Sequence, residues 1–515
     1  MPSVLLYLAL GRGSYACGRG KVCTSLIPRS LRADWRGAEP YAIAQTKAQT
    51  LPDDILLEIF EYHRLASIRS GPWKWHKLAQ VCRRWRFVVF AYPRLLDLRI
   101  ISTSKNAIWE IPDFWPAHLP IIMGYRSPLS VEDEDNMFDV LKNAARICEM
   151  DIDMTRFLLE KCASLLEESF PALEYLRLGS QGTTSLAPLV IPDNFLGNSA
   201  PRLRVIRLQD TVFPSLPRLL STSHNLVSLQ LENIPVDRIF TAQELAVGLS
   251  PATQLESLKI DIQNGAIIPR PLRQDESDPR SVLPALLKFE YVGESWFLSV
   301  FASRIETPII EQIEVSFYGD FDGYDTYELC ALFARGEELR SARHRTTHIR
   351  FFKESVAFTH HFTRSTSSPG SFRVRLISLA WLDEYVSLMW GICLEFQSLG
   401  IMHKVTRVEI EGFPDSSRWH REVNTDRWLA LLRTLSGVKR LHIVGTLVSS
   451  VVTALAQVSG EESGGILPAL RDLHLPDRPG TSADIEPFIA SRTLYGRPVS
   501  VHYKGLDWHD DCSGE

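Results

Sequence analysis

"TLPDDILLEIFEYHRL", residues 50–65, combines the start signals of a helix with a strongly apolar face. Thr50 is a good N-cap residue, and Pro52 suits the first turn, where a missing N–H costs nothing. Two acidic residues then complement the positive end of the helix dipole. The apolar residues fall on one face at helical spacing: Ile55, Leu56, Ile59 and Phe60. This stretch therefore predicts a helix with a single apolar face.

A second helical segment is predicted in "WKWHKLAQVCRRWRFVVFAYP", residues 73–93. Its apolar residues repeat at spacings of three and four, and they are Trp75, Leu78, Cys82, Trp85 and Val89. Three arginines lie off this stripe, and Pro93 ends it. The spacing fits either one helix or two abutting helices.

From Pro93 onward a short motif recurs, P-[AR]-L-x-x-[LIF]-x-[LIY]. It occurs at 93–100, 171–178, 201–208, 284–291 and 468–475. Looser versions begin at 225, 254, 309, 404 and 437, and adjacent units lie about 23 to 36 residues apart. Helix-like segments such as "TAQELAVGL" at 241–249 and "RWLALLRTL" at 427–435 lie between them. The pattern predicts one short strand and one helix per unit.

Residues 51–86 resemble the F-box, a three-helix module by which adaptors of cullin-type ubiquitin ligases bind the Skp1 protein. The resemblance rests on Leu51-Pro52, the acid pair, Ile55, Ile59-Phe60, Leu78 and "VCRRW" at 81–85. The chain after Pro93 resembles the irregular leucine-rich repeat region of the large fungal F-box families. The segment between the first two helices departs from the family, because Trp73 and Trp75 replace a short polar-leucine step.

The resemblance implies a set of residues that contact Skp1: Leu51, Pro52, Ile55, Leu56, Ile59 and Phe60. It also implies a set that forms the core of the F-box: Leu78, Val81, Cys82 and Trp85. A segment of about 40 residues buries little apolar surface alone, so a partner is expected to complete the exposed stripe. The alternative is that the whole stripe is ordinary core packing.

The predicted fold class is α/β, with a small all-α three-helix F-box followed by an irregular leucine-rich-repeat-like solenoid of short strands and helices. The F-box spans 50–93 and the solenoid 94–505. A basic arm, 1–49, is expected to be disordered, and 506–515 form an acidic polar tail. Two polar segments, 265–282 and 353–371, are expected as surface loops. No asparagine follows the L-x-x-L-x-L core in the clear units, so we expect an irregular solenoid.

Composition narrows the function classes. The chain has 515 residues, 45% hydrophobic and 23% charged, and its net charge of -5 disfavours a dedicated nucleic-acid binder. No apolar run reaches the roughly 18 residues of a membrane-spanning helix. Eight cysteines without a C-x-x-C pair fit a reduced compartment, so we expect a cytoplasmic or nuclear protein without membrane or nucleic-acid partners.

Motifs for chemistry are weak. "GRGSYA" at 11–16 has the outline of a dinucleotide turn, but no helix pattern follows it to hold a pyrophosphate. "GDFDGYDTYE" at 319–328 places Tyr324 and Asp325 where a calcium loop needs an oxygen ligand and a glycine. We therefore expect no cofactor, no metal site and no catalytic residue. A nucleotide-binding enzyme at the N-terminus is the remote alternative.

The resemblance implies a non-catalytic subunit of an SCF-type (Skp1–cullin–F-box) E3 ubiquitin ligase. Its F-box would bind Skp1 and through it a cullin. The repeat region would bind an unknown protein substrate for ubiquitin-dependent degradation. The alternative is a scaffold that acts outside the ligase through Skp1 alone.

Overall fold

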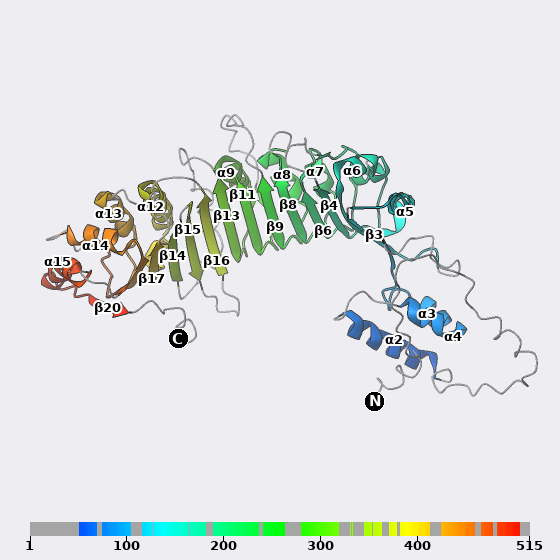
Figure 1. Ribbon diagram of the computed structural model, residues 1–515, viewed down its shortest axis with the longest axis horizontal. Helices are drawn as coiled ribbons and strands as arrows, with labels where there is room; N and C mark the ends of the chain where they lie inside the picture. Colours follow the sequence, from blue (N-terminus) through cyan, green and yellow to red (C-terminus); the bar gives the residue numbers. More distant parts are fainter. Residues whose placement is uncertain are drawn as a thin grey trace, which may run out of the picture. The chain divides into compact units, whose positions relative to one another are not determined.

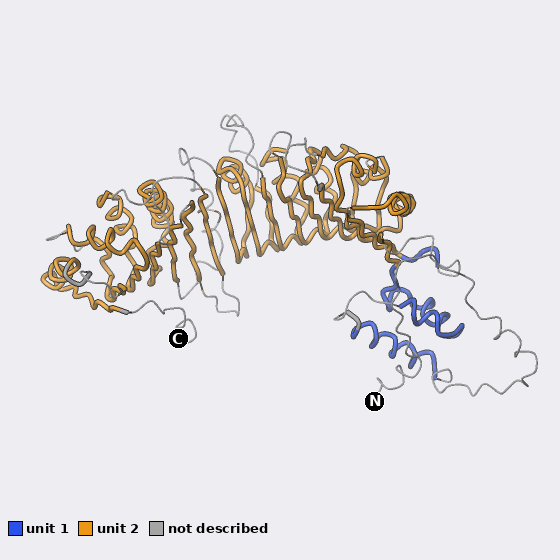
Figure 2. Tube along the Cα trace, in the orientation of Figure 1, with its two compact units in different colours: residues 1–99, 114–119 blue, residues 100–113, 120–515 orange. Residues whose placement is uncertain are grey.

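The computed structural model describes residues 51–68, 75–104, 116–126, 128–162, 164–181, 189–235, 240–262, 280–318, 330, 332, 345–352, 354–362, 370–377, 382–412, 424–458, 465–476 and 481–504. The chain divides into two compact units (Figure 2), one of residues 1–99 and 114–119 and one of residues 100–113 and 120–515. Several predictions concern residues outside the described ranges: the basic arm 1–49 with its "GRGSYA" turn, the acidic segment 319–328, most of the polar segment 265–282 and the tail 506–515.

The first unit contains three described helices: α2 Asp53–Ile68, α3 His76–Val81 and α4 Arg83–Ala91. The second predicted helical segment is thus two abutting helices. Cys82 separates them with an extended backbone, at φ -158° and ψ 170°. Its Sγ accepts the N–H of Trp85 at 3.4 Å and so caps the start of α4.

Aromatic rings hold this unit together. The rings of Phe60 on α2 and Trp85 on α4 meet edge to face, with centroids 5.0 Å apart. Trp75 packs against Phe90 at 5.9 Å, and its indole N–H donates to the carbonyl of Arg99 at 2.8 Å. The buried tryptophan therefore satisfies its polar atom while it joins α4 to the chain that follows.

The second unit is built on one long sheet with helices along one side (Figure 1). In spatial order its strands are β1 Ile100–Thr103, β2 Ile121–Arg126, β3 Ile147–Thr155, β4 Tyr175–Gln181, β6 Val205–Gln209, β8 Ser228–Ile234, β9 Ser257–Ile262, β11 Lys288–Gly293, β13 Gln312–Tyr318, β16 Gly370–Ile377, β15 Ser355–Phe362, β14 Arg345–Phe352, β17 Arg407–Gly412, β18 Arg440–Gly445, β19 Asp472–Pro476 and β20 Ser500–Lys504. Two short pairs lie beside it: β5 Leu189–Val190 with β7 Thr211–Val212, and β10 Ser281–Val282 with β12 Ile305–Glu306.

The described helices of this unit are α5 Val131–Leu141, α6 Arg156–Cys162, α7 Leu216–Leu220, α8 Ala242–Leu249, α9 Ser295–Arg304, α12 Leu382–Ser398, α13 Thr425–Thr434, α14 Val448–Ala456 and α15 Thr481–Leu494. Short 3-10 turns are η5 Ala144–Arg146, η6 Leu165–Glu167, η7 Phe195–Asn198 and η9 Met402–Lys404. Helix α8 begins with a capping box between Thr241 and Glu244. These elements confirm the predicted fold class, a helical module followed by a solenoid of strands and short helices.

The leucines of the recurring motif explain the sheet. In the copy at 201–208, Leu203, Ile206 and Leu208 are all buried, and β6 begins at the fifth position. Strands β4, β11 and β19 begin at the same position of their copies, and the looser copies lead into β8, β9, β13, β17 and β18. The copy at 93–100 differs, because Leu95 is 45% exposed and β1 begins only at Ile100. This copy belongs mainly to the helical unit.

Main-chain carbonyls accept the N–H groups of the turns, a role that an asparagine side chain would otherwise share. The carbonyl of Glu174 accepts the N–H groups of Arg204 and Val205, at 2.8 and 3.1 Å. The carbonyl of Arg204 accepts the next two, from Val227 and Ser228, at 2.7 and 3.0 Å. The same pair of hydrogen bonds recurs at several later strand starts, so these strand starts are held by backbone atoms alone. The parallel register is regular here despite the absent asparagines.

The irregularity of the solenoid lies at β14, β15 and β16. Strand β15 pairs antiparallel with both neighbours, whereas the other adjacent strand pairs described in the long sheet are parallel. The prediction of a surface loop over 353–371 was therefore wrong for Ser355–Phe362. Phe358 and His360 are buried, and His360 Nδ1 lies 3.0 Å from the hydroxyl of Thr347. The sequence looked polar because threonine and histidine alternate with apolar residues, yet threonine favours strands.

We expect Leu203→Ala to lower the free energy of unfolding of the repeat unit by about 2–5 kcal/mol, because it leaves a cavity in a packed row. Leu95→Ala changes the same motif position in the exceptional copy and should cost less than about 0.5 kcal/mol. Urea unfolding followed by circular dichroism measures both. Equal losses would show that the copy at 93–100 is packed like the others.

Candidate functional site

Helix α2 presents two apolar stripes rather than one. Leu56 and Phe60 have no exposed surface and lie in the core of the helical unit. Ile55 is 38% exposed and Tyr62 64% exposed, with Ile59 half-buried between them. Residues 55, 59 and 62 share one face of a helix, and this face is turned about 100° from the Leu56–Phe60 face. The prediction that Leu56 and Phe60 contact a partner is therefore corrected: their side chains are already covered by their own unit.

Arg84 ties down the entrance to α2. Its guanidinium donates to the backbone carbonyl of Leu51 and to the carboxylate of Asp53, where Nη2–Oδ1 is 2.7 Å and Nε–Oδ1 is 3.0 Å. The N–H of Leu56 donates to the carbonyl of Pro52 at 3.1 Å. Leu51 is half-buried and Pro52 exposed. The Leu-Pro step is thus held against the start of the helix while the proline ring faces outward.

The predicted core of the F-box is only partly in the core. Leu78 and Trp85 are buried, at 2% and 4% exposure, and Cys82 is half-buried as the cap of α4. Val81 is 39% exposed, so its assignment to the core was wrong. Helix α3 buries the side that carries Leu78 and Ala79. Val81 follows Ala79 by two residues, about 200° round the helix, and so points away from that side.

Helix α4 carries an exposed aromatic residue that sequence reasoning missed. Phe87 is 70% exposed and borders a hollow of about 420 Å³. The hollow is lined by Arg83, Arg86, Phe87, Phe90 and Ala91. Phe87 lies two residues from both Trp85 and Val89, which places it on the opposite side of the helix. This spacing was the signal that could have found it.

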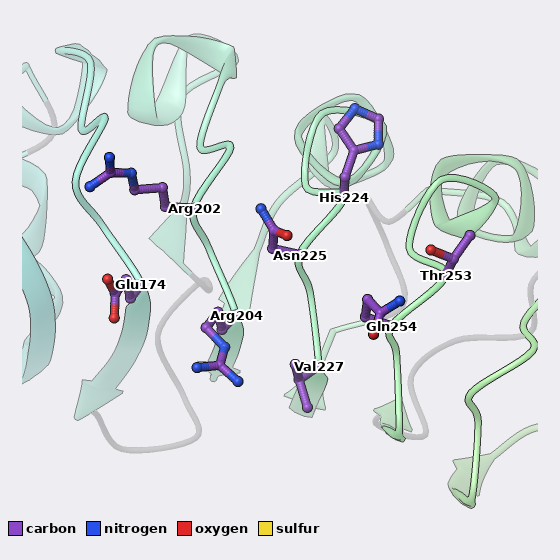
Figure 3. Close-up of a pocket in the computed structure, with 8 residues that line it drawn as sticks. All are labelled: Glu174, Arg202, Arg204, His224, Asn225, Val227, Thr253 and Gln254. Atoms are coloured by element: carbon purple, nitrogen blue, oxygen red, sulfur yellow. The ribbon is translucent and has the colours of Figure 1, made fainter.

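A hollow of the repeat unit lies where strands β4, β6, β8 and β9 begin (Figure 3). Its volume is about 580 Å³, and its lining is Glu174, Arg202, Arg204, His224, Asn225, Val227, Thr253 and Gln254. All of these side chains are exposed or half-buried. The amide of Asn225 is used within the fold, since it donates to the carbonyl of Pro201 at 2.8 Å. The hollow is a shallow surface depression between turns, and its lining contains no buried polar group to orient a ligand.

The described residues offer little for catalysis. Burial raises the pKa of the thiols of Cys162 and Cys393 to about 12, so both stay protonated and are poor nucleophiles. Among the residues described, no three histidine, cysteine, aspartate or glutamate side chains are placed to hold one metal ion.

Within the described ranges, no helix combines the length and apolar character needed to cross a membrane.

Comparison with known proteins agrees with the geometry of the helical unit. Residues 48–95 match the family model described as F-box-like, and they form an F-box-like domain. Proteins with this domain are generally non-catalytic adaptors. Over 75% of its length the chain is similar to a solved structure described as "Crystal structure of TLR13-ssRNA13 complex", at 10% identity and a TM-score of 0.24. It spans 43% of that protein's chain. No curated protein matches it.

We expect Arg84→Ala to loosen the first turn of α2, because it removes the bonds to Leu51 and Asp53. A partly exposed pair of this kind stabilises by up to about 1 kcal/mol, so amide exchange over residues 53–57 should accelerate by about two- to fivefold. Hydrogen exchange read by mass spectrometry measures this. Arg83→Ala, on the exposed side of the same helix, is the matched control. Equal amide exchange rates over residues 53–57 in both variants would show that Arg84 does not stabilise the first turn of α2.

Proposed function

We propose that the chain is a substrate-recognition adaptor of an SCF-type E3 ubiquitin ligase. Its F-box-like domain binds Skp1 and through it a cullin, and its repeat unit binds a protein substrate. The observation that carries the proposal is the F-box-like match of residues 48–95, within which α2 keeps an apolar stripe open to solvent. The proposal places the protein in the cytoplasm or nucleus.

The open stripe defines the proposed contact set. Pro52, Ile55, Ile59 and Tyr62 offer apolar surface on the outer side of α2, and Leu51 stands at its entrance. Covering one large aliphatic side chain completely stabilises a complex by about 1.5–3 kcal/mol, so three or four partly covered residues suffice for a stable contact. Leu56 and Phe60 contribute indirectly, because they fix the helix on which the stripe lies.

The mechanism needs no chemistry in this chain. An adaptor holds its substrate near the conjugating enzyme and so raises the effective concentration of the reacting groups, into the millimolar range for a short connection. A bimolecular encounter becomes an intramolecular one. The long sheet of the repeat unit suits this role, because it exposes polar side chains in fixed register along many strands.

We expect Ile55→Glu to reduce capture of purified Skp1 at least about tenfold, because it places a charge in an apolar contact. Val247→Glu is the matched control, since Val247 is 61% exposed on α8 of the repeat unit. Pull-down and calorimetry measure the binding. Full Skp1 binding by Ile55→Glu would remove the outer stripe from the contact.

The double variant Leu51→Ala with Pro52→Ala tests the entrance of the helix in the same assay. We expect it to lose Skp1 while circular dichroism stays unchanged, because Pro52 is exposed. Unchanged capture would contradict the proposal. Skp1 binding without co-purifying cullin would instead support the scaffold alternative.

A further inference from the structure

The face of the long sheet that is turned away from the helices carries a distinct set of side chains in its last strands. In β17, Val408 and Ile410 are buried on the helix side, while Arg407, Glu409 and Glu411 point the other way. In β18 and β19, Leu441, Ile443, Leu473 and Leu475 are buried on the same side, and His442 on the other side is also buried, at 8% exposure. Figure 1 shows the described helices of this unit along the other side. The polar positions therefore form rows across the strands.

One of these rows is dominated by histidine. The register aligns His348 of β14 with Glu409, then with His442, His474 and His502 of β18, β19 and β20. The rings of His442 and His474 stack at 4.1 Å, and those of His474 and His502 at 4.7 Å. His361 of β15 joins the row, because its ring lies 5.4 Å from that of His348. We refer to His361, His348, His442, His474 and His502 as the histidine row.

Arginines outnumber acids around the histidine row. On this face of β14 to β20, among the side chains that the structure describes, Arg350, Arg373, Arg375, Arg407 and Arg440 stand against Glu409, Glu411 and Asp472. Arg350 pairs with Glu411 at 3.1 Å, Arg440 and His502 share Asp472, and Arg373 reaches Glu314 of β13 at 3.1 Å. The Nε of Arg407 has no hydrogen-bond partner among the described residues, and the charge of Arg407 helps to lower the pKa of Glu409. The surface thus has cationic capacity left over.

Several of these histidines are held neutral. Burial, with His474 and Arg407 nearby, lowers the pKa of His442 to about 3. Burial and His502 lower the pKa of His474, and burial with His348 and two arginines lowers that of His361. His348 lies 3.3 Å from Glu409 and lowers the pKa of that carboxyl. His348, His361, His474 and His502 are exposed or half-buried and can accept protons from solvent, whereas His442 is buried between them.

We infer that the histidine row is a docking surface for an acidic peptide segment, rich in aspartate or glutamate, and that docking takes up protons. The inference rests on the proposed function in one respect, that the repeat unit binds a protein partner. From β15 to β20 the row crosses five strand spacings, about 24 Å. An extended peptide of about seven residues spans that distance.

Charge complementarity favours a peptide over a nucleic acid. Farther along the same face, strands β8 to β13 present Glu232, Asp261, Glu290 and Glu314, of which Glu232 pairs with Lys259 and Glu290 with Lys288. Glu409, Glu411 and Asp472 also interrupt the cationic groups. A continuous phosphate chain would meet these carboxylates at regular intervals, whereas a short acidic segment fits the histidine row alone.

The direction of the pH dependence follows from linkage. A carboxylate near an imidazole favours the charged ring, so the pKa of a row histidine rises when the peptide binds. The complex then holds more protons than the free protein, and binding tightens as the pH falls. The charged groups that face these rings are Arg373, Arg350, Arg407 and Arg440 together with Glu409 and Asp472.

The test uses the full chain and a fluorescein-labelled octapeptide with four glutamates, with its glutamine version as the neutral probe. Fluorescence anisotropy should give a dissociation constant about fivefold or more lower at pH 6.0 than at pH 7.5, for the glutamate peptide alone. His474→Gln with His502→Gln should weaken binding and flatten the pH dependence. His224→Gln, which changes an exposed histidine at another edge of the sheet, should leave both unchanged. Circular dichroism checks folding, and His502→Gln alone serves if the double variant unfolds.

Three results overturn the inference. The first is an equal dissociation constant for the glutamate and the glutamine peptide, and the second is unchanged peptide binding in the histidine variants. The third is a ten-nucleotide oligouridylate that competes with the glutamate peptide and binds more tightly than it. Skp1 capture by the same preparation separates this from the proposed function. Loss of peptide binding with Skp1 capture intact removes only the row, and the reverse outcome removes only the ligase role.

Discussion

The repeat unit depends on one recurring main-chain arrangement, in which the carbonyl before a strand accepts two N–H groups from the start of the next strand. Glu174 and Arg204 show the pattern, and Val227, Glu256, Leu287 and Lys439 repeat it. Because this arrangement uses only backbone atoms, it fixes the register whatever polar side chains the turns carry. The buried leucines of the motif then supply the burial that makes the stack favourable. Backbone hydrogen bonds therefore set the register of the strands, and buried side chains stabilise the stack.

The recurring motif could predict most parallel strands because it records the turn and the first buried residues together. It could not predict β2, because the turn at Pro116 that precedes β2 departs from the motif at His118. It could not predict β3, which has no proline-led turn before it, nor β15, whose threonines and histidines resemble a loop in composition. The motif copy at 93–100 fits the pattern but does not begin a strand at its fifth position. There the pattern is intact, but Leu98 and the residues before it pack with the helical unit, so context overrides the local sequence.

The helical unit shows the same limit on a smaller scale. Apolar residues at 55, 56, 59 and 60 look like one stripe in sequence, yet they divide between a buried and an exposed face. Hydrophobicity alone cannot separate two neighbouring stripes, because the distinction depends on where Trp85 lies. The sequence placed Arg84 only off the apolar stripe of its helix, and in the structure Arg84 donates to the carbonyl of Leu51 and the carboxylate of Asp53. One stripe of α2 thus packs within its own unit, and the other stays open to solvent.

The histidine row follows from the way a repeat turns sequence recurrence into spatial order. Leu441-His442-Ile443, Leu473-His474-Leu475 and Val501-His502-Tyr503 place histidine at the same position of three successive strands. A fixed register brings such residues to one strand spacing, about 4.8 Å, and the observed ring separations of 4.1 and 4.7 Å agree. Stacked imidazoles cannot all be charged cheaply, since each cation disfavours its neighbours. An acidic segment relieves that cost, so the same geometry that suppresses protonation in the free protein couples protonation to binding.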